Sequence, residues 1–444
     1  MARRFAITSR RVVVAGRLRP AAIVVEDDLI NAIVDPEEVP DKIRVDDYGD
    51  AVIMAGLVDP HVHINEPGRS DWEGFETATR AAAAGGITTV VDMPLNSSPV
   101  TTDIEALDEK RRAARGKLSV DTGFYAGLVP GSESNIAELV DAGVLGAKAF
   151  LCHSGIDEFP NATERELRTA MPILAERNKP LLVHAELVDD VDAADDAAPS
   201  SYQAYLKSRP DRWELNAIEL LIDLCRQTGC PVHIVHLATA EAVPMLRAAR
   251  EEGLPITVET APHYLYFAAE EIPDGQPLFK CAPPIRSTDN RKRLHRALNE
   301  GVIDLVATDH SPSPPELKEL DTGDLQSAWG GISSLQLLLP ALWTATKDRG
   351  ATPADIARWT SAAPAKLLGI DDRIGTITPG HRANLAVWSP EAEFSVDATE
   401  LHHRHKITPY HRENLHGRVE ATYLGGHKIF DGTAVATDCR GTAI

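Results

Sequence analysis

The sequence predicts an α/β protein with a (βα)8 TIM-type barrel and a small β-sandwich domain formed from both ends of the chain. Both ends contain short β-prone runs and lack long amphipathic helices. The middle alternates β-prone runs with helical segments, and its length of about 320 residues suits a barrel with insertions. We therefore expect residues 1–55 and 376–444 to form the β domain and residues 56–375 to form the barrel.

The expected β domain takes strands from each end of the chain. Residues 11–14 and 23–25 are apolar and rich in β-branched side chains, and turn residues follow each run. Residues 384–388 are apolar, and residues 419–424 are rich in β-formers. The two groups are expected to pack together as one small domain.

Eight β-prone runs in the middle of the chain are the expected barrel strands. Each is short, and most are followed by a segment with helical character. They cover residues 57–58, 88–93, 120–125, 146–150, 181–184, 232–237, 256–259 and 303–309.

Helical segments separate most of these runs. Residues 103–116 are a good example, because acidic side chains come early, basic ones come late, and Gly116 can adopt the left-handed conformation that ends a helix. The other expected helices cover residues 73–84, 134–141, 164–177, 213–228 and 240–252. The acidic, alanine-rich run 188–198 is predicted to be a solvated loop.

Charge and composition exclude several classes of partner. The 444 residues carry a formal net charge of −21, which repels nucleic-acid phosphates and anionic membrane surfaces. No apolar run approaches the roughly 20 residues that span a bilayer, and the apolar stretch near the N-terminus is too short for a signal peptide. The five cysteines form no C-x-x-C motif, which predicts free thiols and a cytoplasmic location.

Histidines and one acid gather at the ends of the expected barrel strands. His61 and His63 are two residues apart, so their side chains share one face of a strand. His184, His236 and Asp309 end the fifth, sixth and eighth runs. The carboxyl ends of barrel strands form one face, so these side chains are expected to meet there. Each histidine alone could be a hydrogen-bonded core residue, but the five residues together predict a metal site.

Lys148 lies in the middle of the apolar fourth run, where a charged ammonium group is unfavourable. Burial would favour the neutral amine. A neutral amine can react with CO2 to form a carbamate, an anionic oxygen ligand that could bridge two cations. The alternative is an inward-facing lysine that pairs with Asp309 or another acid.

Six such ligands are too many for one tetrahedral zinc ion, but they suit two divalent ions that share a bridge. Zinc fits this donor set best, and Fe²⁺, Co²⁺ or Mn²⁺ would also fit. A two-metal site can activate water as a bridging hydroxide and polarise a carbonyl group. Asp309 could then accept the proton of the attacking water and deliver it to the leaving nitrogen.

These residues resemble those of the amidohydrolase superfamily, in particular its cyclic amidase branch of hydantoinases, dihydroorotases and allantoinases. The resemblance covers nearly the whole chain and rests on residues 56–68, 85–89, 93–94, 146–150, 184–186, 235–236, 280–286 and 308–310. It implies that Lys148 is carbamylated (N6-carboxylysine) and that the subunits form a homo-oligomer, a tetramer by analogy. It also implies one ion held by His61 and His63, a second held by His184 and His236, a bridge from Lys148, and Asp309 as ligand and catalytic acid/base.

Two positions distinguish between the members of this branch. Dihydroorotases carry an arginine for the substrate carboxylate where this chain has Asn65, and hydantoinases carry a tyrosine where it has His153. Residues 66–73, 93–96, 310–318, 328–333 and 404–410 resemble those of allantoinases. That resemblance implies hydrolysis of allantoin, a small neutral molecule, to allantoate in purine breakdown. There are two alternatives: the chain is a hydantoinase or dihydropyrimidinase, or it is a non-catalytic scaffold on the same fold.

Three further residues are candidates for binding the substrate. Asn96 follows the second run, His153 follows the fourth run, and Ser311 follows Asp309. Their alternatives are a turn asparagine, a loop histidine and a hydroxyl that starts a proline-rich loop. The cluster of residues 402–405, which contains three histidines, is expected to be structural because it lies outside the barrel strands.

Overall fold

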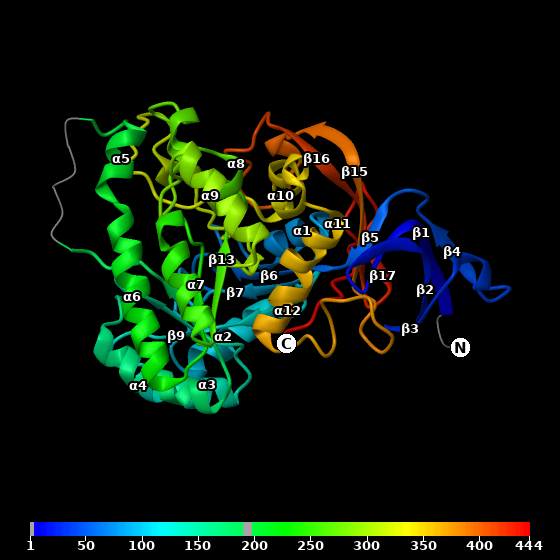
Figure 1. The fold of residues 1–444 in the computed structure, drawn as a ribbon, viewed down its shortest axis with the longest axis horizontal. Helices are drawn as coiled ribbons and strands as arrows, with labels where there is room; N and C mark the ends of the chain where they lie inside the picture. The colour runs from blue at the N-terminus through cyan, green and yellow to red at the C-terminus, as the bar shows by residue number, and fades with distance from the viewer. Residues whose placement is uncertain (1–3, 190–197) are drawn as a thin grey trace.

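The computed structural model describes residues 4–189 and 198–444 and contains the expected (βα)8 barrel beside a small β domain (Figure 1). All eight expected barrel strands are present, the third in two parts (β8 and β9). Their bounds are β6 Leu57–Val62, β7 Ile87–Asp92, β8 Asp121–Phe124, β9 Ala126–Gly127, β10 Ala147–Phe150, β11 Leu181–His184, β12 Val232–Ile234, β13 Ile256–Thr260 and β14 Leu305–Val306.

The barrel strands are parallel and form two ladders, β6-β7-β8 and β9 to β14 in chain order. Single backbone contacts join the ladders. The N–H of Leu145 donates to Phe124 O at 2.9 Å, and the N–H of His63 donates to His310 O at 2.9 Å, next to an isolated bridge between Val62 and His310. These contacts bring the first and last strands side by side around the barrel.

Strands β12 and β14 are shorter than the runs that predict them. The chain leaves the ladder after Ile234 and after Val306, and His236 and Asp309 then take left-handed φ angles of 39° and 46°. A β-strand cannot contain such angles. The runs 232–237 and 303–309 therefore end as loops that turn these two side chains toward the barrel axis.

Helices cover the barrel between its strands (Figure 1). The six expected helices are present, with those at 134–141 and 240–252 beginning as 3-10 turns. Helices α5, α8, α9, α10, α11 and α12 were not expected; α9, for example, has a mostly polar sequence and buries only four side chains. The helices are α1 Phe75–Ala84, α2 Ile104–Ala114, α3 Ile136–Asp141, α4 Glu164–Glu176, α5 Tyr202–Ser208, α6 Asp211–Thr228, α7 Val243–Glu251, α8 Pro262–Tyr266, α9 Thr288–Asn299, α10 Leu338–Thr346, α11 Pro353–Ala357 and α12 Ala363–Leu368.

Both ends of the chain contribute to the small β domain. Its strands are β1 Arg4–Val14, β2 Arg17–Glu26, β3 Leu29–Val34, β4 Arg44–Asp47, β5 Val52–Ala55, β15 Leu385–Ser395, β16 Asn414–Leu424 and β17 His427–Phe430. They form one sheet in the order β17-β16-β15-β5-β1-β2-β3, with β4 beside β1. The antiparallel pairing of β5 with β15 joins the two ends of the chain.

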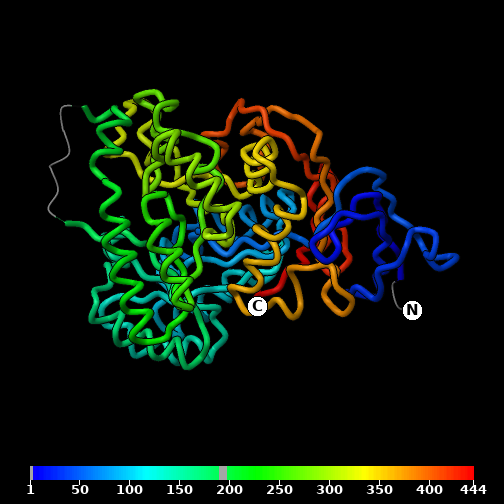
Figure 2. Tube along the Cα trace, in the orientation of Figure 1, coloured from blue at the N-terminus to red at the C-terminus, as the bar shows by residue number. Residues whose placement is uncertain are grey.

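The last residues of the chain return from the small sheet to the barrel (Figure 2). Ala443 forms a bridge with Thr122 of β8, and the N–H of Gly441 donates to Leu118 O at 2.9 Å. The expected domain boundaries at residues 55/56 and 375/376 stay a prediction.

Other features of the described residues agree with expectations from composition. All five cysteines are free thiols. None of the helices in residues 4–189 and 198–444 is long and apolar enough to cross a membrane. Most of the acidic run 188–198 lies outside the described residues.

Candidate active site

A pocket of about 500 Å³ lies where the barrel strands end at their carboxyl side. All four predicted histidines and the predicted acid line it: His61, His63, His184, His236 and Asp309. The predicted substrate residues Asn96, His153 and Ser311 line the same pocket. The structure therefore brings together residues that are up to 250 positions apart in the sequence, in the way that the barrel topology predicts.

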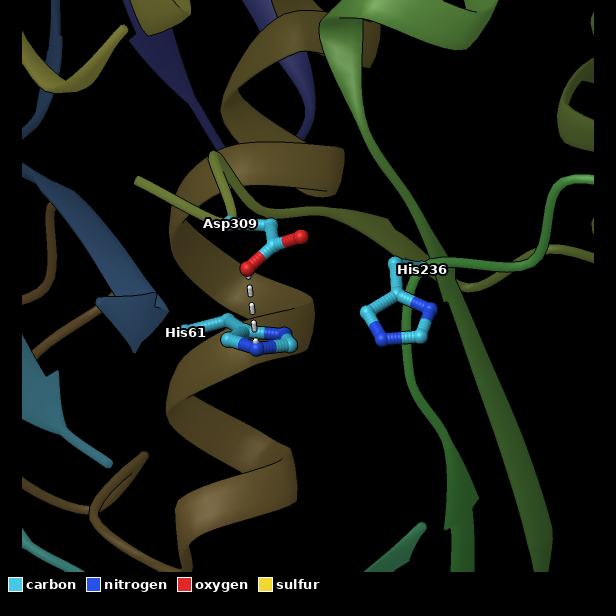
Figure 3. Close-up of side chains that lie close together, drawn as sticks. All are labelled: His61, His236 and Asp309. Atoms are coloured by element: carbon cyan, nitrogen blue, oxygen red, sulfur yellow. Dashed lines mark ion pairs between the residues drawn. The ribbon is translucent and has the colours of Figure 1, made fainter. Parts of the chain in front are cut away.

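Asp309 lies against the first two histidines. Its Oδ1 is 3.3 Å from His61 Nε2 and 3.5 Å from His63 Nε2. The ring of His236 lies across from His61 and Asp309 (Figure 3). Each of the three residues offers one ligand atom, and these three atoms lie within 4.8 Å of one another. This is a spacing that one divalent ion could bridge.

His184 extends this group. Its ring lies 4.6 Å from the ring of His236, centroid to centroid, and stacks on Phe150 at 4.5 Å. His184 also forms a second possible metal-binding group with Cys152 and Glu186. Burial raises the pKa of the Cys152 thiol to about 12, so it is protonated at neutral pH.

Lys148 is completely buried on β10, and its Nζ has no hydrogen-bond partner in the described part of the chain. The alternative of an ion pair with Asp309 is not found among these residues. Burial lowers the pKa of Lys148 to about 8, which is well below the usual value for lysine. A substantial fraction of this amine is therefore neutral near pH 7 to 8.

The other buried nitrogens also suit a metal. Burial lowers the pKa of His63 to about 4 and that of His236 well below its usual value, so both rings are neutral at pH 7. The Nδ1 atom of His236 is buried and has no partner within the described residues. Unpaired, neutral imidazole nitrogens beside a carboxylate are the donor set that Zn²⁺ and similar ions prefer. The residues present therefore fit a divalent metal ion.

The backbone is strained where the site is built. Asn65, Asn96, His236 and Asp309 all have φ between 39° and 66°, a region that side chains other than glycine rarely adopt. Such conformations cost about 1–3 kcal/mol each and persist where the surroundings enforce them. The strain therefore coincides with four of the residues that the sequence singled out.

Glu259 is an important site residue that the sequence analysis missed. It is buried on β13, with Oε1 2.5 Å from His61 Nδ1 and Oε2 3.0 Å from His233 Nε2. Burial alone would raise the pKa of Glu259, but His61 and His233 hold it below its usual value. An acid in the apolar run 256–259 is the same kind of anomaly as Lys148, so the signal was present in the sequence.

Glu186 plays the equivalent part for His184. Its Oε2 lies 2.6 Å from His184 Nε2 and 2.5 Å from Arg209 Nη2. A carboxylate that accepts a hydrogen bond from one nitrogen of a histidine fixes the orientation and the tautomer of the ring, so the other nitrogen is free to bind a metal. Two of the histidines are thus aimed by buried acids, Glu259 and Glu186.

The predicted substrate residues differ in how firmly they are held. Ser311 Oγ donates to Asp309 Oδ1 at 3.1 Å. Asn96 Nδ2 is 3.5 Å from His63 Nδ1, and its Oδ1 is buried without a partner among the described residues. The side chain of His153 is 62% exposed, and its Nδ1 accepts from the N–H of Gly155 at 3.1 Å. His153 therefore lies at the rim of the pocket.

The histidines of residues 402–405 lie outside the pocket. His403 is buried, and its ring lies 5.6 Å from the ring of His310. The N–H of the next residue, Arg404, donates to Glu73 at 3.1 Å. These contacts attach the segment to the barrel beside Asp309, in keeping with a structural role.

Comparisons with known proteins agree with this arrangement. The model of the amidohydrolase family matches residues 52–427. The chain is 47% identical to a probable allantoinase of Oryza sativa subsp. japonica, over 96% of this chain and 88% of that protein, and 44% identical to an allantoinase of Arabidopsis thaliana, over 98% and 90%. Among solved structures, an L-hydantoinase (dihydropyrimidinase) from Arthrobacter aurescens superposes with a TM-score of 0.94, at 30% identity and 99% coverage of both chains.

Proposed function

The chain belongs to the amidohydrolase family, and on that premise we propose that it hydrolyses the hydantoin ring of allantoin to allantoate, a step of purine breakdown. It is a hydrolase of C–N bonds in cyclic amides, and its substrate is a small molecule. The observation that carries the proposal is the meeting of His61, His184, His236 and Asp309 in one pocket, in a chain that is similar to allantoinases over almost its whole length.

The proposed cofactor is a pair of divalent metal ions, with zinc favoured and iron, cobalt or manganese as alternatives. Lys148 would bridge them as a carbamate, formed when its neutral amine attacks CO2 and releases one proton. The low pKa of Lys148 and the absence of a partner for its Nζ in the described residues support this. The remaining ligands would be His61 and His63 for one ion, His184 and His236 for the other, and Asp309.

When bound, such ions lower the pKa of a water molecule and polarise the ring carbonyl. The residues of the chain then control orientation and protons. Glu259 holds the ring of His61 from behind, and Glu186 holds that of His184.

Asp309 is the proposed acid/base. Burial would raise the pKa of Asp309, but His61, His63 and His236 hold it well below its usual value, so it is an ionised proton acceptor at neutral pH. In the proposed step, the Asp309 carboxylate accepts a proton from the attacking water while a C–O bond forms. It then delivers that proton to the ring nitrogen as the C–N bond breaks, which leaves a free ureide N–H group and a carboxylic acid that releases the second proton of the water to become the carboxylate.

Polar groups at the pocket support a neutral, donor-rich substrate. Asn65, which donates to Pro312 O at 3.3 Å and is not among the lining residues, offers no positive charge to a substrate carboxylate, and at the rim His153 stands where hydantoinases have a tyrosine. Asn96 and Ser311 can bind the ureide. The N–H of Gly330, which also lines the pocket, donates to no protein group in residues 4–189 and 198–444.

A hydantoinase or dihydropyrimidinase activity is the second candidate. The similarity in fold to the Arthrobacter aurescens enzyme favours it. A non-catalytic scaffold is disfavoured because all six proposed ligand positions carry a side chain that can bind a metal. We also propose the domain limits 1–55 with 376–444 and 56–375, a homotetramer by analogy, and a location in the cytoplasm.

Metal removal tests the proposal directly. Protein loaded with Zn²⁺ should contain about two ions per chain and convert allantoin to allantoate. A chelator, or the substitutions His61→Ala and His236→Ala, should remove both metal and activity, whereas His381→Ala, far from the pocket, should change neither. Full activity in protein shown to be free of metal would overturn the proposed mechanism.

A further inference from the structure

Two lysines converge on one wall of the pocket. The wall is formed by residues 326–331, here called the wall loop, and five of its residues line the pocket: Gln326, Ala328, Trp329, Gly330 and Gly331. Lys280 begins the stretch 280–286, and Lys318 ends the stretch 310–318. Both stretches are among those that carry the family resemblance, but neither lysine has a role in the proposed reaction.

The amino groups of both lysines donate to backbone carbonyls of the wall loop. Lys280 Nζ lies 2.8 Å from Gln326 O and 2.6 Å from Ala328 O. Lys318 Nζ lies 3.1 Å from Trp329 O and 2.5 Å from Gly331 O. Four of the six carbonyls of the loop are therefore held by two side chains.

Packing alone does not explain why lysines occupy positions 280 and 318. Lys318 is buried, with 1% of its surface exposed, and within the described residues neither lysine forms an ion pair with a carboxylate. Burial lowers the pKa of Lys318 to about 7 and that of Lys280 to about 8, and a methionine would fill the same volume without the cost of burying a polar group. What a lysine adds is an amino group that donates short, directed hydrogen bonds to two carbonyls at once.

The wall loop has no helix or strand of its own, and its first residues are held by Asp324, which accepts from the N–H groups of Gln326 and Ser327. Its regular backbone bonds include Gly331 N–H to Lys280 O at 2.8 Å and Trp329 N–H to Leu317 O at 2.7 Å. Gly331 has φ +117°, and a Cβ there would lie 2.3 Å from Ser311 O. The neighbouring Gly330 lines the pocket, and a Cβ there would meet only Lys280, at 3.9 Å from its carbonyl oxygen. The position of the Gly330 N–H depends on carbonyls that the lysines hold.

We infer that Lys280 and Lys318 are positioning residues that hold the wall loop in the shape that binds the substrate ring. Both act through the loop, and neither is a proposed metal ligand or the proposed acid/base; Lys318 lies behind the loop, whereas Lys280 also lines the pocket. The inference rests on the proposed function only for the identity of the substrate. A displacement of about 1 Å in a positioning group can change efficiency by up to about 100-fold, so the effect is measurable.

The test uses the metal-loaded full chain with Lys318→Met and Lys280→Met, and Lys292→Met on the exposed side of α9 as the matched control. Both pocket variants should raise KM for allantoin roughly tenfold or more, with kcat changed by less than about threefold. Metal content and the mass of the carbamylated chain should stay as in the parent. Hydrogen exchange of the amides in residues 326–331 should become faster, and Lys292→Met should match the parent in every measurement.

Chemical rescue separates positioning from packing. In Lys318→Ala, methylamine or ethylamine should lower KM again, since a small amine can occupy the vacated site and donate to both carbonyls, whereas an alcohol of similar size has a single O–H donor and should not. A lower melting temperature with unchanged KM, or equal rescue by the alcohol, would overturn the inference. If Lys318→Met does not fold, Lys280→Met at the half-buried edge carries the same test.

The test of the two lysines does not depend on which substrate the enzyme hydrolyses. If the parent hydrolyses dihydrouracil but not allantoin, the proposed function fails, and the same comparison of KM and kcat is made with dihydrouracil. An unchanged KM for the hydrolysed substrate in both lysine variants would then refute the role of the lysines alone.

Discussion

At the scale of single residues, the site depends on buried groups whose charge is set by their surroundings. Lys148 is the clearest case, because it is buried, unpaired within the described residues and has its pKa lowered to about 8. An ammonium ion could not lie between two metal cations, whereas a carbamate supplies a bridging anion.

We therefore predict that Lys148→Ala loses bound metal and activity, and that short-chain carboxylic acids restore part of both. Intact mass of the active, metal-loaded parent should exceed the sequence mass by one CO2. Lys292→Ala, on the surface, should keep metal and activity. An active, metal-loaded parent with an unmodified Lys148 would contradict the account.

Glu259 allows a finer test of how a ligand is aimed. Replacing it with glutamine keeps the size but removes the charge that holds His61 Nδ1 and His233. We predict that Glu259→Gln weakens metal binding about 10- to 100-fold, as expected for a carboxylate behind a metal-binding histidine. Competition with a chelator measures this affinity. Glu270→Gln, at an exposed helix end, is the control, and equal affinity in both variants would count against the role of Glu259.

The six proposed ligands could be selected from the sequence because each is a polar residue within or just after an apolar run, and all but Lys148 lie toward the end that barrel topology makes functional. Glu186 lies only two residues after His184, in a segment that carries the family resemblance, but it was given no role. Glu259 was missed because its partner, His61, is 198 residues away, and no spacing rule connects the two. Only the fold shows that the two side chains meet.

At the scale of elements, local chemistry fixes where helices begin. Helix α4 starts with a capping box in which Thr163 Oγ1 accepts from the helix backbone and the N–H of Thr163 donates to Glu166 Oε2 at 2.7 Å. Although burial opposes it, the hydrogen bonds from Thr163 lower the pKa of Glu166 to about 2. The ionised form of Glu166 is therefore the one that stabilises the folded state.

This gives a prediction with a definite sign. A carboxyl whose pKa is lower in the folded state contributes stability above its unfolded pKa of about 4.3, and loses it as pH falls toward about 2. Thr163→Ala should destabilise the start of α4 by about 1 kcal/mol at pH 7, measured by hydrogen exchange of its first amides. Thr169→Ala, on the exposed face of the same helix, should have a smaller effect. The difference should shrink between pH 4 and pH 2, and a constant difference would contradict the assignment.

Prediction of elements succeeded for the barrel strands and failed for half of the described α-helices, including α10, which is apolar and largely buried. The eight strands are apolar runs, so they could be found. Helix α9 is mostly polar and is held by few buried side chains, and the early ends of β12 and β14 follow from the positive φ angles of His236 and Asp309. Such turns are imposed by contacts across the barrel, which no local window contains.

At the scale of the whole molecule, a buried acid joins three parts of the chain. Asp121 at the start of β8 forms an ion pair with Arg382, which precedes β15, and accepts from the N–H and hydroxyl of Thr442, both at 3.0 Å. Burial raises the pKa of Asp121, although Arg382 opposes the shift. The barrel, the β domain and the C-terminal residues thus share one side chain.

We predict that Asp121→Asn destabilises the protein by roughly 1–3 kcal/mol, because it leaves Arg382 without its charge partner. It should also release the last residues of the chain. Thermal unfolding and limited proteolysis near residue 440 measure the two effects. Asp438→Asn, an exposed acid in the same tail, is the control. Equal proteolysis rates in the two variants would show that Asp121 does not hold the tail.

The central claim for the whole molecule is that this metal-dependent cyclic amidase selects allantoin. A site that binds the polar groups of a ureide rejects analogues that lack them, since its own groups would be left unpaired at about 1–3 kcal/mol each. Dihydroorotate should also be poor, because Asn65 gives its carboxylate no positive partner.

The most direct test is kcat/KM of metal-replete protein for allantoin, dihydrouracil and hydantoin, measured side by side. We predict that the value for allantoin exceeds the other two by at least roughly 100-fold, which requires only about 2.7 kcal/mol of difference in transition-state binding. Equal or higher efficiency on dihydrouracil, with allantoin inert, would contradict the account and assign the protein to the dihydropyrimidinases.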